Sequence, residues 1–532
     1  MSLSETHSNS NNHTVISVIQ RSVHNFVKRN TEEPSLSVND DNSYSEDESS
    51  HLLGKHTQHF PHHLRVNGNQ DEDVHILYET LNTPAGQATH RQHSIITIFS
   101  MWNTMMGTSL LSMPWTIKQA GFINGIVLLV LMAGIMAYTS YRVLAVCRSS
   151  SGGSLVEFSD AVRIYLGRIV EGGALVCSIL TLVGGCIVYW ILMSNFLFHI
   201  GIFIYSKSNR LFVIAKTVYI FLFNDHKNKL ISATCDNKTA IVVYNGNLFD
   251  KMWDETKTIP FYLVVLIFPI INLKSPTFFT KFNSFGTLFV IYLAVFVLVK
   301  AGQWGINIDL NIEHASSWKY SSAFEWTFPA LTGVAALAYL LQNAVVSIVR
   351  NQKYPENNTR DLIIAYILVC STYTVLGAVF YASFPLEKSC IEDNFLNNIA
   401  STDIMAFVAR IGLFFQLLCV LPLLTFIIRA QLLNFIFQTS WPSFKHVLIL
   451  NLLIVSISVV FAVFLPNIGH IIGFVGGFCG FSYAIALPCA VYLVSSYQNG
   501  SLTVLKSIFH SALILIGLAN FLAQFVIIGH TK

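Results

Sequence analysis

Long apolar runs constrain this chain more than any other feature of its sequence. They follow one another from residue 95 to residue 528, separated by short polar breaks. About 20 residues of α-helix span the hydrocarbon core of a bilayer, and most of these runs approach that length. Hydrophobic residues make up 53% of the chain and charged residues 11%, a balance that excludes a string of soluble domains. The sequence therefore predicts an all-α polytopic membrane protein.

The apolar runs predict eleven transmembrane helices. Five spans, five more and one extra fit a five-plus-five inverted repeat with one added helix. Residues 93–532 would then form one transmembrane domain with a long loop at 206–258. The spans are expected at residues 95–115, 121–146, 171–205, 259–273, 284–304, 324–350, 361–384, 403–428, 446–466, 471–495 and 505–528.

The first span makes a poor continuous helix. Polar side chains that compete for backbone hydrogen bonds crowd it, and Gly107 and Pro114 weaken it further. These polar residues are Asn103, Thr104, Thr108, Ser109 and Ser112. In hydrocarbon, irregular backbone persists only where it faces protein or a water-filled cavity. The stretch predicts a binding site at an unwound helix, the alternative being a Gly/Ser/Thr packing face between helices.

The span at 324–350 is interrupted in a similar way. Its stretch Phe328–Asn343 contains Pro, Thr and Gly, with Tyr, Gln and Asn following. Each segment alone could be an ordinary kinked span. Interrupted segments at corresponding positions in two halves of a chain indicate a transport site. Thr332 and Gly333 therefore join the first-span residues as candidates for substrate binding.

Residues 1–92 differ in composition from the rest of the chain, with many Ser, Asn, Asp, Glu and His residues and few aromatic ones. We expect most of this tail to be disordered, because it cannot bury enough apolar area. Residues 15–29 place Ile16, Ile19, Val23, Phe26 and Val27 at helical spacing. Such a short amphipathic helix needs a surface, for which a partner protein is favoured over the membrane. Residues 74–84 could plug a cytosolic opening of the membrane domain or serve only as a linker.

Basic residues predict the orientation of the chain in the membrane. With the tail in the cytosol, the short outer loops hold only Lys118, Lys319 and Lys388. The long loop 206–258 contains several lysines, but long translocated loops follow the rule poorly. The cytosolic connections hold Arg148, Arg163, Arg168, Lys274, Lys281, Arg350, Lys353, Arg360, Arg429 and Lys445. The N-terminus is therefore expected in the cytosol and the C-terminus on the opposite side.

Two further features agree with this orientation. Asn237 begins an N-glycosylation sequon in the predicted outer loop. Cys235 and Cys390 both fall in outer loops and could pair in an oxidising compartment. The nine cysteines show no metal-ligand spacing, so no metal site is predicted. Further sequons on the predicted cytosolic side, at Asn12, Asn357 and Asn499, mean that a sequon alone decides little.

A broken helix suits the chemistry of a free amino acid. Free N–H groups and a positive dipole end on one half attract a carboxylate, and free carbonyls on the other half attract an ammonium group or a cation. The spans contain almost no acidic side chains, so a bound guanidinium would meet carbonyls, hydroxyls or water. No hydrolase or nucleotide-binding motif indicates an enzyme, and no repeated filter segment indicates a channel. The small net charge of +3 gives no reason to expect a nucleic-acid partner.

The chain resembles the sodium-coupled neutral amino acid transporters, and specifically their lysosomal branch, whose members sense arginine upstream of mTOR complex 1. The stretches that carry the resemblance are Trp102–Ser109, Pro114–Phe122, Val188–Phe198, Pro260–Val264, Arg360–Tyr366 and His446–Leu452. The resemblance covers the whole membrane part and extends into the tail, and it implies eleven spans in a LeuT-like five-plus-five arrangement.

The resemblance implies a lysosomal membrane protein that binds arginine at the unwound first span and exports essential amino acids such as leucine, as a symporter or antiporter. It implies no cofactor, although sodium is possible. Asn103 resembles the asparagine implicated in cation coupling, and Thr425 is the nearest hydroxyl to the expected sodium ligand in the eighth span. The candidate substrate-binding residues are Asn103, Thr104, Met105, Met106, Gly107, Thr108, Ser109, Thr332 and Gly333.

The resemblance also implies partners. Residues 18–21 resemble the segment that binds the Ragulator–Rag GTPase complex, and Arg410–Leu417 fits a loose sterol-contact pattern. The candidate partner-binding residues are Ile16, Val18, Ile19, Gln20 and Arg21. Two alternatives stay open at this point: a receptor that does not transport, and an ordinary plasma-membrane transporter whose tail is an inert linker.

Overall fold

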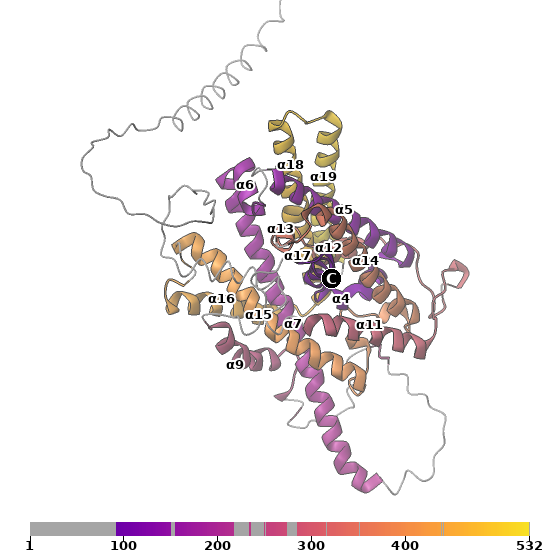
Figure 1. Cartoon of the computed structure of the whole chain (residues 1–532). Coiled ribbons are helices and arrows are strands. Elements are labelled where there is room, and N and C mark those ends of the chain that lie inside the picture. The colour runs from indigo at the N-terminus through magenta and orange to yellow at the C-terminus, as the bar shows by residue number, and fades with distance from the viewer. Residues whose placement is uncertain are drawn as a thin grey trace, which may run out of the picture. The chain divides into compact units, whose positions relative to one another are not determined.

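The computed structural model describes residues 92–149, 155–217, 233–235, 249, 252–273, 285–314, 316–350, 352–437, 439 and 441–530. These residues are mostly helical, and Figure 1 shows how the helices are arranged. The α-helices are α3 (Ser94–Met105), α4 (Ser109–Ala120), α5 (Phe122–Ser149), α6 (Phe158–Leu166), α7 (Arg168–Thr217), α9 (Ile259–Ile271), α11 (Phe285–Trp304), α12 (Pro329–Ala338), α13 (Val345–Arg350), α14 (Asn358–Ser383), α15 (Ile404–Phe437), α16 (Phe444–Phe464), α17 (Ile468–Cys479), α18 (Leu487–Gln498) and α19 (Val504–His530). Short 3₁₀ turns lie at Ile312–His314, Pro355–Asn357, Lys388–Cys390 and Phe395–Asn398, and the π-helix η5 (Gly480–Ala486) joins α17 to α18.

Eight helical segments within the described ranges are long and apolar enough to cross a membrane. The chain is therefore a polytopic helical membrane protein, as its apolar runs predict. The other three predicted spans consist of shorter helices: α3 with α4, α9 alone, and α12 with α13. The eight segments are Phe122–Arg148, Arg168–Ser206, Gly286–Trp304, Pro355–Ser383, Ile404–Phe437, Phe444–Phe464, Ile468–Gln498 and Val504–Val526.

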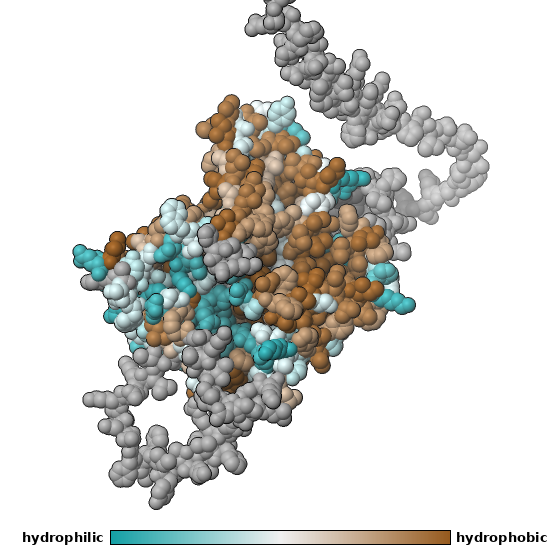
Figure 2. Space-filling model, turned by 180° about the vertical axis from the view of Figure 1, so that it is seen from behind, coloured by the Kyte–Doolittle hydropathy of each residue, from teal (hydrophilic) through white to brown (hydrophobic). Residues whose placement is uncertain are grey.

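Large apolar side chains cover much of the outer surface of these helices. Figure 2 shows hydrophobic residues over a wide part of the face seen there. The exposed apolar side chains of the whole bundle include Val130 on α5, Ile291 on α11, Leu453 on α16 and Leu515 on α19, each more than half exposed. Monomeric water-soluble proteins rarely expose apolar patches of this extent, whereas a lipid environment favours them.

The two interrupted segments lie at the centre of the bundle. α12 packs against α4, α5, α17 and α19, while α14 packs against α3, α4, α5 and α11. Small residues bring α12 and α17 very close together. A Cβ atom added at Gly476 would lie 2.1 Å from the carbonyl oxygen of Gly333, so only glycine fits there.

The bundle has two ends, which we call the α3 end and the Cys390 end. At the α3 end, Lys353 donates its N–H to the carbonyl of Gln92 at 2.8 Å, which ties the start of α3 to the segment after α13. At the Cys390 end, the N–H of Phe122 donates to the carbonyl of Ser322 at 2.8 Å, which ties the start of α5 to the segment before α12. α15 begins directly after the segment that contains Cys390 and runs to the α3 end.

Some local structure differs from the sequence prediction. The predicted span 471–495 is one continuous helical rod in which η5 interrupts the α-helical bonding. The amphipathic helix α6 at Phe158–Leu166 was not predicted, because nine residues make too short a run to stand out beside the spans. The predicted helix at 15–29 and the predicted plug at 74–84 lie outside the described residues.

Candidate functional site

The first membrane segment is broken between α3 and α4. α3 ends at Met105 and α4 begins at Ser109. Met106 has an extended conformation with ψ 96°, and its N–H still donates to the carbonyl of Trp102 at 3.0 Å. Within the described chain the amide N–H groups of Thr108 and Ser109, the first donors of α4, have no acceptor. The interruption predicted from the sequence is therefore present, and it leaves backbone donors free.

The second interruption lies between α12 and α13. α12 ends at Ala338 and α13 begins at Val345. Pro329 begins α12 and does not interrupt a helix as its sequence position predicts, since proline is well tolerated in the first helical turn. The non-helical residues are 339–344, about ten residues later than the Pro and Gly positions indicate.

Buried hydroxyl groups from neighbouring helices satisfy the backbone at both interruptions. The hydroxyl of Tyr373 on α14 donates to the carbonyl of Met105 at 2.5 Å and also lies 3.3 Å from the carbonyl of Ala338. One α-helical side chain thus contacts the last residue of α3 and the last residue of α12. Tyr366, two turns away on α14, donates to the carbonyl of Tyr339 at 3.0 Å. These contacts stabilise irregular backbone that would otherwise expose unpaired carbonyls inside the protein.

The side chain of Gln342, which lies within the second interruption, stabilises it by hydrogen bonds. Its Oε1 accepts the N–H of Leu341 at 3.0 Å, and its Nε2 donates to Thr139 on α5 at 2.8 Å. Gln342 is completely buried. A buried amide that uses its carbonyl and its amino group fixes the path of the chain between α12 and α13.

A cavity of about 280 Å³ lies where the two interruptions meet. We call it the central cavity. Thr104, Gly107 and Asn343 are exposed in it, and a Cβ atom added at Gly107 would meet nothing within 4 Å. None of its lining residues, all within the described ranges, is charged. The lining residues are Asn103, Thr104, Met106, Gly107, Thr108, Leu110, Leu111, Tyr189, Phe196, Val290, Leu293, Asn343, Ala344, Leu413, Gln416, Leu417, Val420, Leu424 and Ile427.

Most of the first-span candidates reach this cavity. Asn103, Thr104, Met106, Gly107 and Thr108 line it. The other two candidates of this stretch, Met105 and Ser109, lie beside it and are buried. The local reason is helical geometry: residues on the far side of a helix end cannot face the same space as their neighbours.

The second-span candidates lie elsewhere. The hydroxyl of Thr332 donates to Asn520 Oδ1 on α19 at 2.6 Å. Gly333 packs against α17, where an added Cβ atom would lie 2.6 Å from the carbonyl of Gly473. Both are helix-packing residues within α12, and neither lines the central cavity. Asn343, ten residues after Gly333, faces the cavity instead.

The two residues expected to bind a cation have different surroundings. Asn103 Oδ1 accepts a hydrogen bond from the Thr287 hydroxyl on α11 at 2.7 Å. Thr425 is buried, and its hydroxyl contacts carbonyls of its own helix, Leu421 at 3.2 Å and Pro422 at 3.0 Å. Thr425 does not line the central cavity, whereas Asn103 does.

Sequence reasoning missed the cavity residues of the long helices. Tyr189 and Phe196 on α7 and Gln416 on α15 line the cavity. Gln416 is a lone amide within an apolar span, which is a signal that could have been followed. The apolar pattern does not distinguish the two aromatic residues from their neighbours, because α7 is rich in apolar side chains along its length.

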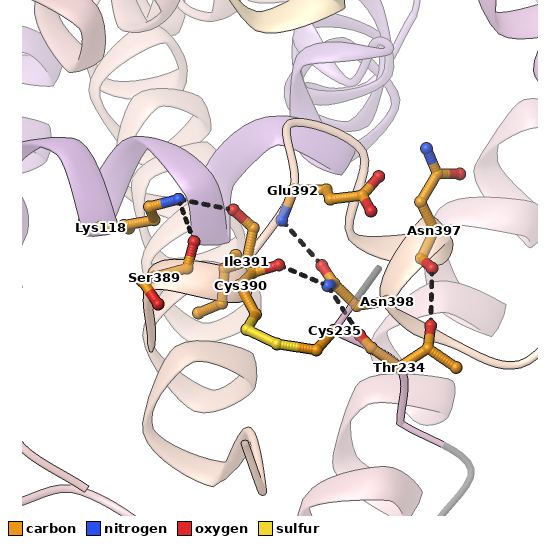
Figure 3. Close-up of a disulfide and its surroundings, with 9 residues drawn as sticks. All are labelled: Lys118, Thr234, Cys235, Ser389, Cys390, Ile391, Glu392, Asn397 and Asn398. Carbon is orange, nitrogen blue, oxygen red and sulfur yellow. Dashed lines mark hydrogen bonds between the residues drawn. A yellow bond between two sulfur atoms is a disulfide. The ribbon is translucent and has the colours of Figure 1, made fainter. Parts of the chain in front are cut away.

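A disulfide and a hydrogen-bond network close the Cys390 end. Cys235 and Cys390 form the disulfide that the sequence pattern allows, with Cα atoms 4.9 Å apart. Figure 3 shows that Asn398 links the two segments that the disulfide joins. Its side-chain amide donates to the carbonyl of Cys390 at 2.8 Å and to the carbonyl of Thr234 at 3.2 Å. Lys118, near the end of α4, donates to the carbonyls of the two residues that flank Cys390, Ser389 at 2.7 Å and Ile391 at 3.1 Å.

The buried Lys388 and the half-buried Asp393 lie in the loop that carries Cys390. Burial, together with the smaller effect of the positive charge of Lys319, lowers the pKa of Lys388 to about 7. The Lys388 ammonium donates to the carbonyl of Phe384 at 2.9 Å. Burial raises the pKa of Asp393, although its carboxylate accepts the N–H of Gly469 at 2.9 Å. The predicted glycosylation site Asn237 and the tail residues Ile16, Val18, Ile19, Gln20 and Arg21 lie outside the described residues.

Comparison with known proteins identifies the family. The family model described as transmembrane amino acid transporter protein matches residues 90–234 and 217–529. The sodium-coupled neutral amino acid transporter 9 homolog of Caenorhabditis elegans is 43% identical over 473 residues, which cover 85% of this chain and 76% of that protein. Neutral amino acid transporter 9 of Rattus norvegicus is 43% identical over 446 residues, covering 81% of this chain and 79% of the relative.

A solved structure is also similar. The crystal structure of MhsT in complex with L-phenylalanine covers 83% of this chain and 100% of its own, with 12% sequence identity and a TM-score of 0.47. The family match extends over nearly all of the membrane part, and the relatives above exceed 40% identity. The chain therefore belongs to the transmembrane amino acid transporter family and, within it, to the group of neutral amino acid transporter 9 proteins.

Proposed function

We propose that this chain binds a free amino acid in the central cavity and carries it across a membrane. The observation that carries the proposal is the meeting of two interrupted helices at one uncharged cavity. Paired interruptions of this kind are typical of secondary transporters that bind substrate near the middle of the membrane. The names of the relatives, which are neutral amino acid transporters, support the same substrate class.

The site chemistry suits a zwitterion. The N-terminus of α4, with the amide groups of Thr108 and Ser109, provides donors and a positive dipole end for the carboxylate. The carbonyls at the C-terminal end of α3 provide acceptors for the ammonium group. Asn103 and Asn343 add amide groups from the two interruptions, and Phe196 and Leu417 give the side chain of the substrate an apolar wall.

We propose eleven crossings in a five-plus-five arrangement with one added helix. The eight long helices, with three crossings made from the shorter pieces, support this count. An odd number of crossings places the termini on opposite sides, and the basic residues favour a cytosolic N-terminus. The α3 end would then face the cytosol and the Cys390 end the lumen. The disulfide at the Cys390 end is consistent with an oxidising compartment there.

We further propose that the protein resides in the lysosomal membrane, exports leucine and other essential amino acids, and senses arginine for mTOR complex 1. The tail would bind Ragulator and the Rag GTPases through Ile16, Val18, Ile19, Gln20 and Arg21. Support comes from the amphipathic pattern of residues 15–29 and from the resemblance of residues 18–21. A ligand can change the exposure of the tail only through its differential affinity for the two states of the protein. Sodium coupling through Asn103 and contact with sterols at Arg410–Leu417 belong to the same proposal.

Uptake into proteoliposomes tests the proposed function. Gly107→Trp should abolish uptake of labelled arginine and leucine, because the new ring projects into the central cavity. Gly107→Ala should retain most of the uptake, since a Cβ atom at this position meets no neighbour. Unchanged uptake in the tryptophan variant, with a normal elution profile, would contradict the proposed site. Uptake with and without sodium tests the coupling ion.

A further inference from the structure

A second cavity, of about 610 Å³, lies beside α6 at the α3 end of the bundle. We call it the outer cavity. Its polar lining residues are Ser159 and Arg163 on α6, Arg168, Glu171 and Ser178 on α7, Gln431 and Asn434 on α15, and Tyr483 on η5. Unlike the central cavity, it carries charged groups of both signs.

The outer cavity continues the central cavity along α15. Val420, Leu424 and Ile427 line the central cavity, and Gln431 and Asn434 line the outer one. These five positions are spaced four, three, four and three residues apart, so they share one face of the helix. Both cavities therefore lie along the same face of α15.

α7 shows the same continuity. Tyr189 lines the central cavity, whereas Ser178 and Glu171 line the outer one. Intervals of eleven and seven residues correspond to about three and two helical turns, so these side chains also share a face. Between the two cavities the helices are in contact: a Cβ atom added at Gly185 would lie 3.5 Å from the side chain of Leu424.

The charged groups of the outer cavity remain able to bind a ligand. Arg163 Nε and Glu171 Oε2 form a loose ion pair at 3.9 Å, longer than a hydrogen bond, between side chains that are 50% and 33% exposed. Arg168 is exposed and forms no ion pair within the described part of the chain. The cavity thus offers two guanidinium groups and one carboxylate, with amide and hydroxyl groups around them.

We propose that the outer cavity is a second binding site for a free amino acid on its path to or from the central cavity. This inference rests on the proposed transport function. Arg168 and Arg163 bind the carboxylate of the amino acid, which guanidinium groups recognise through paired hydrogen bonds. Glu171 binds the ammonium group. The outer cavity is less suited to the phosphate of an anionic lipid, because the negatively charged carboxylate of Glu171 would repel a phosphate bound in the same cavity.

Binding stoichiometry tests this proposal. The full chain is placed in phosphatidylcholine nanodiscs, and bound labelled L-arginine is measured by equilibrium dialysis into the millimolar range. The wild type should bind two equivalents of arginine per chain. Arg168→Gln and Glu171→Gln should each lower the affinity for the second equivalent of arginine by about tenfold or more, because each removes a charge-assisted hydrogen bond to the ligand. Arg168→Lys should retain the second equivalent in part, because it keeps the charge.

Two controls separate this proposal from the proposed function. Arg148→Gln removes an exposed arginine at the same end of the bundle and should leave both equivalents unchanged. Gly107→Trp fills the central cavity and should leave only the outer equivalent. A wild type that binds one equivalent, unaffected by Arg168→Gln, would overturn the outer site and leave the central site standing. Two equivalents that persist in Gly107→Trp would instead overturn the central site.

Discussion

The hydroxyl of Tyr373 donates a 2.5 Å hydrogen bond to the carbonyl oxygen of Met105, the last residue of α3. The same hydroxyl lies 3.3 Å from the carbonyl of Ala338, the last residue of α12. Tyr373 is fully buried, and its ring packs against that of Tyr339 with centroids 5.5 Å apart. One side chain of α14 therefore holds the ends of both interrupted segments at a fixed separation.

Removing this hydroxyl should loosen both interruptions. Tyr373→Phe leaves the Met105 carbonyl without its partner, which costs about 1–3 kcal/mol for a buried group. We expect a lower unfolding temperature and arginine uptake reduced several-fold, measured in purified protein and in proteoliposomes. Tyr497→Phe changes an exposed tyrosine and serves as the matched control. Equal unfolding temperatures for the two variants would show that the contact is unimportant.

The first interruption could be predicted from the sequence, but the second could be only partly predicted. Between Asn103 and Ser109 the polar groups and Gly107 act locally, so their effect on the helix is readable from the sequence alone. Pro329 and Gly333 also look like helix breakers. In the structure the first of them begins a helix and the second packs against α17, and both outcomes depend on tertiary neighbours.

The site of the second interruption depends on residues distant in sequence. The carbonyl of Tyr339, which lies outside α12, accepts its hydrogen bond from Tyr366, 27 positions later. Gln342 similarly depends on Thr139, which lies 203 positions earlier. A single sequence does not reveal such pairs. The prediction made from the sequence therefore places Thr332 and Gly333 at the site and misses the full role of Asn343.

The contact between Thr287 and Asn103 predicts an effect on cation dependence. The Thr287 hydroxyl orients the Asn103 amide by donating to its Oδ1. If Asn103 binds sodium, Thr287→Val should raise the sodium concentration for half-maximal uptake several-fold, because the amide loses its fixed orientation. Thr287→Ser keeps the hydroxyl and should behave like the wild type. Uptake measured against sodium at constant osmolarity decides the point, and identical sodium curves for the two variants would exclude the role.

The disulfide should contribute strongly to stability. It joins residues 155 positions apart, and loss of a native disulfide typically costs about 2–5 kcal/mol. Cys390→Ser should therefore lower the unfolding temperature. The double variant Cys235→Ser/Cys390→Ser should be no less stable than the single one, because both remove the same bond. Additive losses would mean that each cysteine stabilises the protein separately.

Glycosylation of Asn237 tests the proposed orientation. If the loop that follows Cys235 lies on the luminal side, Asn237→Gln should abolish the mobility shift that glycosidase treatment produces on gels. Asn357→Gln alters a sequon at the α3 end and should leave that shift unchanged. Loss of the shift in the Asn357 variant alone would reverse the proposed topology.

Lys388 predicts a pH dependence of stability. Its pKa falls from the ordinary 10.5 to about 7 in the folded protein, first because of burial and then because of the nearby Lys319 charge. The unfolded chain therefore binds more protons at this residue than the folded chain between about pH 7 and 10.5, so this residue makes the free energy of unfolding rise with pH across that range. Below about pH 7 Lys388 is charged in both the folded and the unfolded state, and the cost of burying its ammonium group is constant.

Lys388→Met removes this pH dependence, so the unfolding temperature of the variant relative to wild type should fall as pH rises. Lys445→Met, at an exposed position, serves as the matched control. Parallel unfolding curves for wild type and Lys388→Met at pH 6 and pH 9 would mean that the Lys388 ammonium is not desolvated, because a solvated lysine keeps its ordinary pKa.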